Sequence, residues 1–152
     1  MRRLITRRLK TCSNLTFRPE KNFMTQTIND ALELAERWSS AFTQADVTEV
    51  MGLFAPDAVF LGTSSKTIVA STEGIKKYFE NSLLGSRRYV SVLTDIHVTA
   101  LSHDAAMITA LNTITITDNN QSDDVLGRLS IAARKYEGEW KIAQFHRSAM
   151  PE

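Results

Sequence analysis

The spacing of apolar residues predicts three helices in the first half of the chain. Between residues 28 and 43 apolar side chains recur every three or four positions, which is typical of a helix with one buried face. The same spacing predicts a shorter helix over residues 48–55 and a third over residues 73–84. Thr27 or Asn29 is the expected N-cap of the first helix, because a short polar side chain there can accept a hydrogen bond from a free backbone N–H.

From Tyr89 onward the hydrophobic pattern changes to a period of two, which predicts strands. The four expected long strands cover residues 89–101, 105–117, 125–137 and 140–150. A short strand is expected over residues 57–63, and residues 64–71 form either another short strand or a loop. Helices followed by antiparallel strands predict fold class α+β, with about three N-terminal helices packed on one face of a strongly curved, mostly antiparallel sheet.

The two faces of this sheet have different patterns. In the strand over residues 105–117, Asn112 shares a face with isoleucines and alanines, and threonines dominate the other face. The isoleucine face is expected to meet the helices, which leaves Asn112 as an internal polar group. In the last strand, simple alternation places Ile142 with His146 and Phe145 with Arg147, so both faces are half apolar. Since the helices cover one side only, a second copy of the sheet is expected to cover the other.

Composition indicates one ordinary globular domain. The chain has 152 residues, of which 43% are hydrophobic and 23% charged, which excludes collagen-like, disulfide-stapled and wholly disordered proteins. Cys12 is the single cysteine, so no intrachain disulfide can form, which suits a reducing, cytoplasmic compartment. The three histidines are scattered, so neither a metal site nor a cofactor is expected.

Charge separates the N-terminal segment from the rest. Residues 1–23 contain seven basic residues and one acidic residue, whereas the remainder contains eleven basic and sixteen acidic residues. We therefore divide the chain into a basic leader, residues 1–24, and a single domain, residues 25–152. The leader is a mitochondrial transit peptide, which would imply the matrix, or a miscalled start before Met24, or a disordered basic tail that contacts a membrane or nucleic acid. The acidic domain predicts no nucleic-acid partner, and no apolar run reaches the roughly 20 residues that span a membrane.

Two polar side chains in the predicted sheet are candidates for ligand binding. Arg147 could bind a small anion or polarise a carbonyl, and it could equally form a salt bridge or a contact across a dimer. Asn112 could orient a ligand as donor and acceptor, or be satisfied by neighbouring backbone or a buried water.

Other side chains are candidates for acid–base chemistry or for the wall of a pocket. His146, His97 and Asp57 are the possible acid–base groups, and each could instead be structural or solvated. Trp38 and Tyr78 are most simply core aromatics, and they could also line the mouth of a pocket.

The last strand resembles the closing strand of the calcium/calmodulin-dependent protein kinase II association domain. The segment EGEWKIAQFHRSAMP resembles its Gly-x-Trp turn and Phe-His-Arg-Ser ending, and EGIKKYFENSL resembles its third helix. The opening AERWSSAFTQADVTEVMGLFAPDAVF is similar to the wider nuclear transport factor 2-like, SnoaL-like superfamily, which includes the SgcJ/EcaC proteins. The resemblance covers residues 28–151 and implies a cone-shaped fold with a pocket between helices and sheet, assembled into dimers or rings through the sheet.

The resemblance also implies where a ligand would bind. In the association domain three pocket arginines can receive a carboxylate, and their positions correspond to Asn112, Ile131 and Arg147 here. Only Arg147 is still arginine, so this pocket would hold one cation in place of three. No kinase signature accompanies the domain.

These observations lead to two alternative functions. The first is a stand-alone homo-oligomeric association-type domain, without catalysis, whose partners are itself and a small apolar or carboxylate-bearing ligand. The second is a cofactor-independent isomerase, dehydratase or hydrolase that acts on a hydrophobic substrate by proton transfer. The enzyme would need an aspartate or histidine with a shifted pKa facing the pocket.

Overall fold

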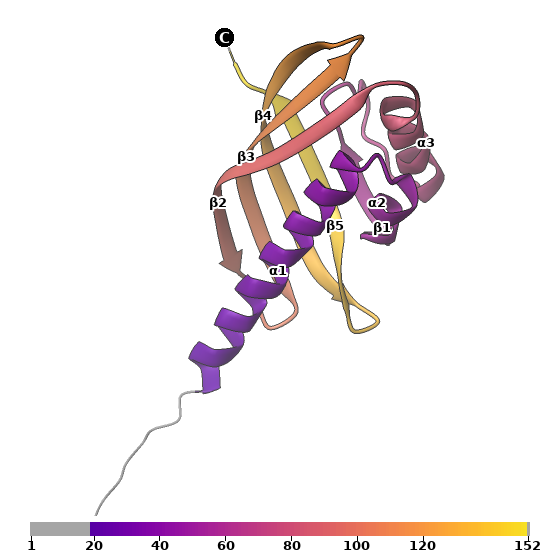
Figure 1. Cartoon of the computed structure of the whole chain (residues 1–152). Helices are drawn as coiled ribbons and strands as arrows, with labels where there is room; N and C mark the ends of the chain where they lie inside the picture. Colours follow the sequence, from indigo (N-terminus) through magenta and orange to yellow (C-terminus); the bar gives the residue numbers. More distant parts are fainter. Residues whose placement is uncertain (1–18, 152) are drawn as a thin grey trace, which may run out of the picture.

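A computed structural model describes residues 19–151 and has the predicted α+β architecture (Figure 1). The helices of this range are α1 (Pro19–Thr43), α2 (Val47–Gly52) and α3 (Thr72–Leu83). Its strands are β1 (Phe54–Leu61), β2 (Arg88–Ala100), β3 (Ala105–Asp118), β4 (Gln121–Tyr136) and β5 (Glu139–Ala149). The helix-then-strand order and the four long strands confirm the prediction from hydrophobic periodicity.

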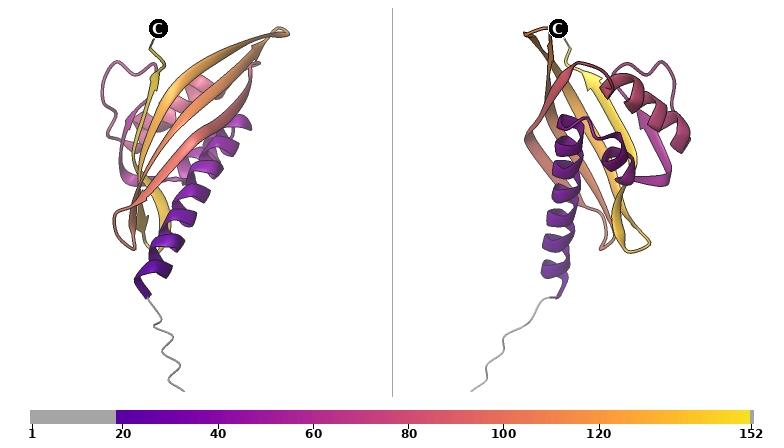
Figure 2. Two further views of the ribbon diagram at one scale, coloured as in Figure 1. Left: turned by 90° about the vertical axis from the view of Figure 1, so that its left-hand side faces the viewer. Right: turned by 45° about the vertical axis from the view of Figure 1, so that its right-hand side comes forward.

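The strands form one curved sheet in the order β1-β5-β4-β3-β2. Neighbouring strands are antiparallel except β1 and β5, which are parallel. The helices lie to one side of the sheet, with α1 running along β2 and β3 and with α2 and α3 beside the β1 edge (Figures 1 and 2). The opposite face of the sheet carries no helix of the described chain.

In the range that the structure describes, no helix is both long and apolar enough to cross a membrane.

Two predicted helix boundaries are wrong. Helix α1 begins at Pro19, a favoured first residue of a helix, so Thr27 and Asn29 lie inside it and are not N-caps. Thr27 is buried, and its hydroxyl instead donates to the His103 carbonyl oxygen at 3.4 Å. The predicted second helix extended too far, because Phe54 and Ala55 already belong to β1. Residues 1–18 of the predicted leader lie outside the described residues.

A β-bulge corrects the predicted faces of the last strand. Ala132 pairs with Gln144 and Ala133 pairs with Ile142, so Ala143 is an extra residue in β5. The extra residue resets the alternation, and Ile142, Phe145 and Arg147 all point toward the helices and are buried. The prediction that Ile142 shares a face with His146 is therefore wrong.

An aromatic cluster fills the space between the sheet and the helices. The rings of Phe60 and Phe145 are stacked with centroids 5.2 Å apart, and Trp38 lies 4.9 Å from Phe145. Phe79 of α3 packs edge-on against Phe60 at 5.3 Å. These four side chains are almost completely buried. The cluster joins α1, α3, β1 and β5 into one core.

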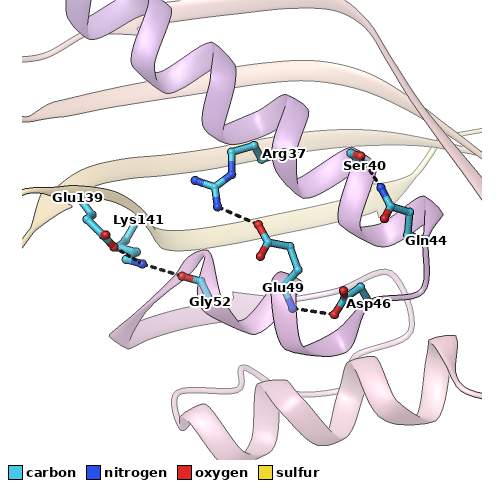
Figure 3. A network of polar contacts seen from close by, with 8 residues as sticks. All are labelled: Arg37, Ser40, Gln44, Asp46, Glu49, Gly52, Glu139 and Lys141. Carbon is cyan, nitrogen blue, oxygen red and sulfur yellow. Dashed lines mark hydrogen bonds and ion pairs between the residues drawn. The ribbon is translucent and has the colours of Figure 1, made fainter.

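A surface network of polar contacts fixes α1 and α2 relative to each other and to β5 (Figure 3). Arg37 of α1 pairs with the Glu49 carboxylate at 2.8 Å, and Asp46 caps α2 by accepting from the Glu49 backbone N–H at 2.9 Å. Lys141 of β5 donates to the Gly52 carbonyl oxygen at 2.7 Å. Because Arg37 and Glu49 are about half exposed, their ion pair contributes at most about 1 kcal/mol. The network is therefore a structural feature of the surface.

Candidate functional site

A cavity of about 410 Å³ opens beside the aromatic cluster, between α3, the loop after β1 and the inner face of the sheet. Its walls are mostly aromatic and aliphatic, as is usual for a small-molecule site. The large apolar side chains that line it are Trp38, Phe42, Phe60, Phe79, Tyr89 and Phe145. Polar groups enter the lining from the loop after β1, from α3 and from the C-terminal end of β5.

Arg147 is the buried cation of this cavity. Arg147 is 5% exposed, and all its hydrogen-bond partners within the described residues are neutral. The Nε atom donates to Oδ1 of Asn112 at 2.7 Å, and Nη1 donates to the Thr63 hydroxyl at 2.7 Å. The Nη2 atom donates to two backbone carbonyl oxygens, that of Val125 at 2.7 Å and that of Asn112 at 3.2 Å. No ion pair within residues 19–151 includes Arg147. Among the described residues, the site therefore holds a positive charge without a counter-ion.

Gly127 provides the space that the Arg147 guanidinium occupies. It lies in β4 directly opposite Asn112 of β3, two residue pairs away from Arg147 in the ladder to β5. A Cβ atom on Gly127 would lie 2.6 Å from Cζ and 2.7 Å from Nη2 of Arg147. Any larger residue would push the guanidinium out of its place, so this strand glycine serves close packing rather than a turn.

Asn112 holds the guanidinium through a buried polar chain that reaches helix α1. Its side-chain Nδ2 donates to the Ser91 hydroxyl at 3.0 Å and to the Val92 carbonyl oxygen at 3.1 Å, while Oδ1 accepts from Arg147. The Ser91 hydroxyl lies 2.8 Å from that of Ser39 in α1. Because both N–H groups of the amide are used within the protein, Asn112 is fixed as a positioning residue for Arg147.

Tyr78 of α3 brings a second polar group to the cavity. Its hydroxyl accepts a hydrogen bond from the Ser64 hydroxyl at 3.2 Å, and Ser64 follows Thr63, the partner of Arg147. Gly62 makes room for it, since a Cβ atom there would lie 2.4 Å from the Tyr78 hydroxyl oxygen. Burial lowers the pKa of Arg147, and the electrostatic interaction with nearby Tyr78 opposes that shift.

The charged groups of the cavity are all positive. Of the described residues that line it, the ionic ones are Arg147 inside and Arg87 near the surface, and none is Asp, Glu or His. Arg87 is more than half exposed and pairs with Asp118 at 3.4 Å. The arrangement can attract and neutralise an anion, and it offers no carboxylate or imidazole to move a proton.

The structure brings only some of the predicted site residues together. Arg147, Trp38 and Tyr78 line the cavity, and Asn112 lies directly behind Arg147. Ile131 is completely buried in the core and does not line the cavity.

The three possible acid–base residues lie elsewhere. His146 points to the outer face of the sheet, in register with Ser130. His97 is exposed in β2, with its Nε2 atom 3.1 Å from Oδ1 of Asp95. Asp57 is exposed in β1 and bonds to Arg134.

Sequence reasoning missed three residues that shape the site, namely Gly62, Thr63 and Gly127. A glycine inside a strongly alternating strand is a signal for close approach of another group, so Gly127 could have been found. Gly62 and Thr63 lie in a loop whose position follows from the parallel pairing of β1 with β5, and the sequence pattern gives no sign of that pairing.

Comparison with known protein families gives one match that spans most of the chain. The family model of the SnoaL-like domain matches residues 31–152. No curated protein matches the chain significantly.

Solved structures with the same fold include one at substantial sequence identity. A protein of Xanthomonas campestris, provisionally named a calcium/calmodulin dependent protein kinase II association domain, is 35% identical, with a TM-score of 0.74 over 80% of this chain and 86% of that chain. A nuclear transport factor 2-like protein of unknown function from Pseudomonas putida is 22% identical, with a TM-score of 0.74 over 85% of this chain and 91% of that chain. A ketosteroid isomerase-like protein from Erwinia carotovora atroseptica is 17% identical, with a TM-score of 0.70 over 84% of this chain and 98% of that chain. The last two show the fold alone.

Proposed function

This chain belongs to the SnoaL-like domain family, and we propose that it is a non-catalytic, homo-oligomeric protein whose cavity binds a small apolar molecule carrying one carboxylate. The observation that carries this proposal is the buried Arg147 guanidinium, which has only neutral hydrogen-bond partners. A charge removed from water costs several kcal/mol unless an opposite charge meets it. A bound carboxylate supplies that charge, and the aromatic walls accept the apolar remainder of the ligand.

Among the described residues, the cavity lacks the carboxylate or imidazole that the enzymatic alternative requires. Isomerase or dehydratase chemistry needs a carboxylate or imidazole within hydrogen-bond reach of the substrate. Among the described lining residues there is no Asp, Glu or His, and Asp57, His97 and His146 lie outside the cavity. The observations therefore favour binding over catalysis.

Replacing Arg147 by methionine should weaken binding of naphthalene-2-carboxylate about 10- to 100-fold, because a charge-assisted hydrogen bond is lost and methionine has no charge. Isothermal titration of the full-length protein measures this change. The neutral 2-methylnaphthalene, which fills the same walls without an acceptor, should bind the wild type and the variant with similar affinity.

Arg128→Met is the matched control, because Arg128 lies on β4 with its side chain exposed on the other face. Its affinity for the carboxylate should equal that of the wild type. Equal carboxylate affinity in Arg147→Met and the wild type would contradict the proposal.

The outer face of the sheet supports self-association. Five large apolar side chains from four strands lie on it and are 37–50% exposed, namely Val59, Val90, Val92, Leu111 and Leu126. Threonines of β3 continue this apolar surface between β2 and β4. We propose a second copy of the same face as its partner, since Val92, Thr113 and Leu126 lie side by side across β2, β3 and β4 and the 35% identical structure carries the name of an association domain.

Light scattering of the full-length protein should give a mass of roughly 34 kDa or a larger multiple of the 17.0 kDa chain, as closed symmetric assembly requires. Leu126→Glu should reduce this to the monomer mass, because a carboxylate would be buried without a partner. Leu84→Glu places the same charge at an exposed position beyond α3 and should leave the mass unchanged. A wild-type monomer at micromolar concentration would refute self-association.

Two finer assignments stay proposals. A cytoplasmic location is favoured by the single cysteine at position 12, which leaves no intrachain disulfide. Membership of the SgcJ/EcaC group rests on the similarity of the segment from Ala35 to Phe60 alone.

A further inference from the structure

We propose that Tyr78 is a second hydrogen-bond donor to the ligand, so that Arg147 and Tyr78 bind one carboxylate, each donating to one oxygen. The inference rests on the proposed function and adds a named donor and a ligand class to it. Its basis is the set of donors at the cavity that have no acceptor among the described residues, namely one N–H of Arg147, the Tyr78 hydroxyl and the Trp38 indole N–H. The first two are linked through the consecutive residues Thr63 and Ser64.

Four of the five N–H groups of Arg147 are already used by the protein. Nε donates to Asn112, Nη2 donates both of its hydrogens to carbonyl oxygens, and Nη1 donates one to Thr63. One N–H on Nη1 has no acceptor among the described residues. A single N–H cannot form the paired bonds by which a free guanidinium usually holds both oxygens of a carboxylate. A second donor is therefore needed for full recognition.

The Tyr78 hydroxyl has the required unused hydrogen. It accepts from the Ser64 hydroxyl at 3.2 Å, and its own O–H has no acceptor within the described part of the chain. Tyr78 is partly buried and lines the cavity, so its O–H is available to an acceptor atom of a bound ligand. Thr63 and Ser64 are consecutive and bond to Arg147 and Tyr78 respectively, which holds the two donors beside each other.

Two glycines provide the space that the two donor side chains occupy. A Cβ atom on Gly62 would lie 2.4 Å from the Tyr78 hydroxyl oxygen, and one on Gly127 would lie 2.6 Å from Arg147 Cζ. Each donor therefore fits only because the facing residue has no side chain. Gly62 lies in the loop after β1 and Gly127 lies in β4, and the two donors that they accommodate line the same cavity.

The charge of the site selects a monoanion. One buried positive charge matches one carboxylate, whereas a phosphate monoester brings a second negative charge. Arg87 near the surface is already paired with Asp118 and is more than half exposed, so it offers little compensation for that second charge. We therefore expect naphthalene-2-carboxylate to bind more tightly than naphthyl phosphate.

Titration of full-length Tyr78→Phe with naphthalene-2-carboxylate tests the proposal. The affinity should fall about 10-fold, the effect of losing one hydrogen bond to a charged group. Tyr136→Phe, which removes a hydroxyl far from the cavity, should bind as the wild type does. Binding of 2-methylnaphthalene should be the same for Tyr78→Phe and the wild type, because this probe has no acceptor.

The outcomes separate this inference from the proposed function. If Arg147→Met loses carboxylate affinity and Tyr78→Phe does not, the inference is overturned and the proposed function stands. Equal losses of carboxylate and methylnaphthalene affinity in Tyr78→Phe would assign Tyr78 to packing alone, which also overturns it. If the wild type binds no carboxylate, the proposed function fails and the inference fails with it.

Discussion

Replacing Phe60 by alanine should lower the free energy of unfolding by about 4 kcal/mol, the cost of removing a fully buried phenylalanine and leaving a cavity. Phe60 is completely buried, and its ring stacks on Phe145 and packs against Phe79 and Tyr78. These partners belong to β5 and α3, so the core cannot contract around the gap without moving two elements. Chemical denaturation monitored by tryptophan fluorescence measures the change.

Ile68→Ala provides the matched control for this measurement. Ile68 is 68% exposed in the loop before α3, and truncating it should change the free energy of unfolding by less than about 0.5 kcal/mol. A cost below about 1.5 kcal/mol for Phe60→Ala would mean that the aromatic cluster repacks, and the walls of the cavity would then not be rigid.

The fold was accessible from the sequence because one period of hydrophobicity specifies each type of element. Apolar spacing of three or four placed Trp38 on the buried face of α1, and strict alternation placed Asn112 on the inner face of β3, where it is 1% exposed. Each of these inferences needs only local pattern. The prediction that the last strand is apolar on both faces was wrong, because Ile142 and Phe145 are both buried on the inner face.

The site was less accessible because its geometry depends on departures from those periods. The bulge at Ala143 inserts one extra residue into β5 and shifts the in–out alternation of its side chains by one residue. Alternation alone therefore put Ile142 on the wrong face. The contact of Arg147 with Thr63 depends on the parallel pairing of β1 with β5, which brings together residues 84 positions apart. Local patterning contains neither piece of information.

Replacing Asn112 by leucine, which has a similar size, should lower the free energy of unfolding by about 3 kcal/mol. The substitution removes the acceptor of the buried Arg147 Nε–H bond and the donors to Ser91 and Val92, and Asn112 itself is 1% exposed. A buried charged donor without its acceptor accounts for most of this cost. Thermal and chemical denaturation of the full-length variant give the value.

The double variant Asn112→Leu/Arg147→Met distinguishes this charge effect from simple loss of packing. Arg147→Met alone should change the free energy of unfolding by no more than about 1 kcal/mol, because the lost hydrogen bonds are offset by removal of a buried charge. In the double variant no buried guanidinium remains without its acceptor, so this variant should be more stable than Asn112→Leu by about 1.5 kcal/mol. Strictly additive costs would show that Asn112 does not hold the guanidinium. Near-native stability of Arg147→Met together with lost carboxylate affinity would establish that the protein retains this arginine for its ligand and not for its fold.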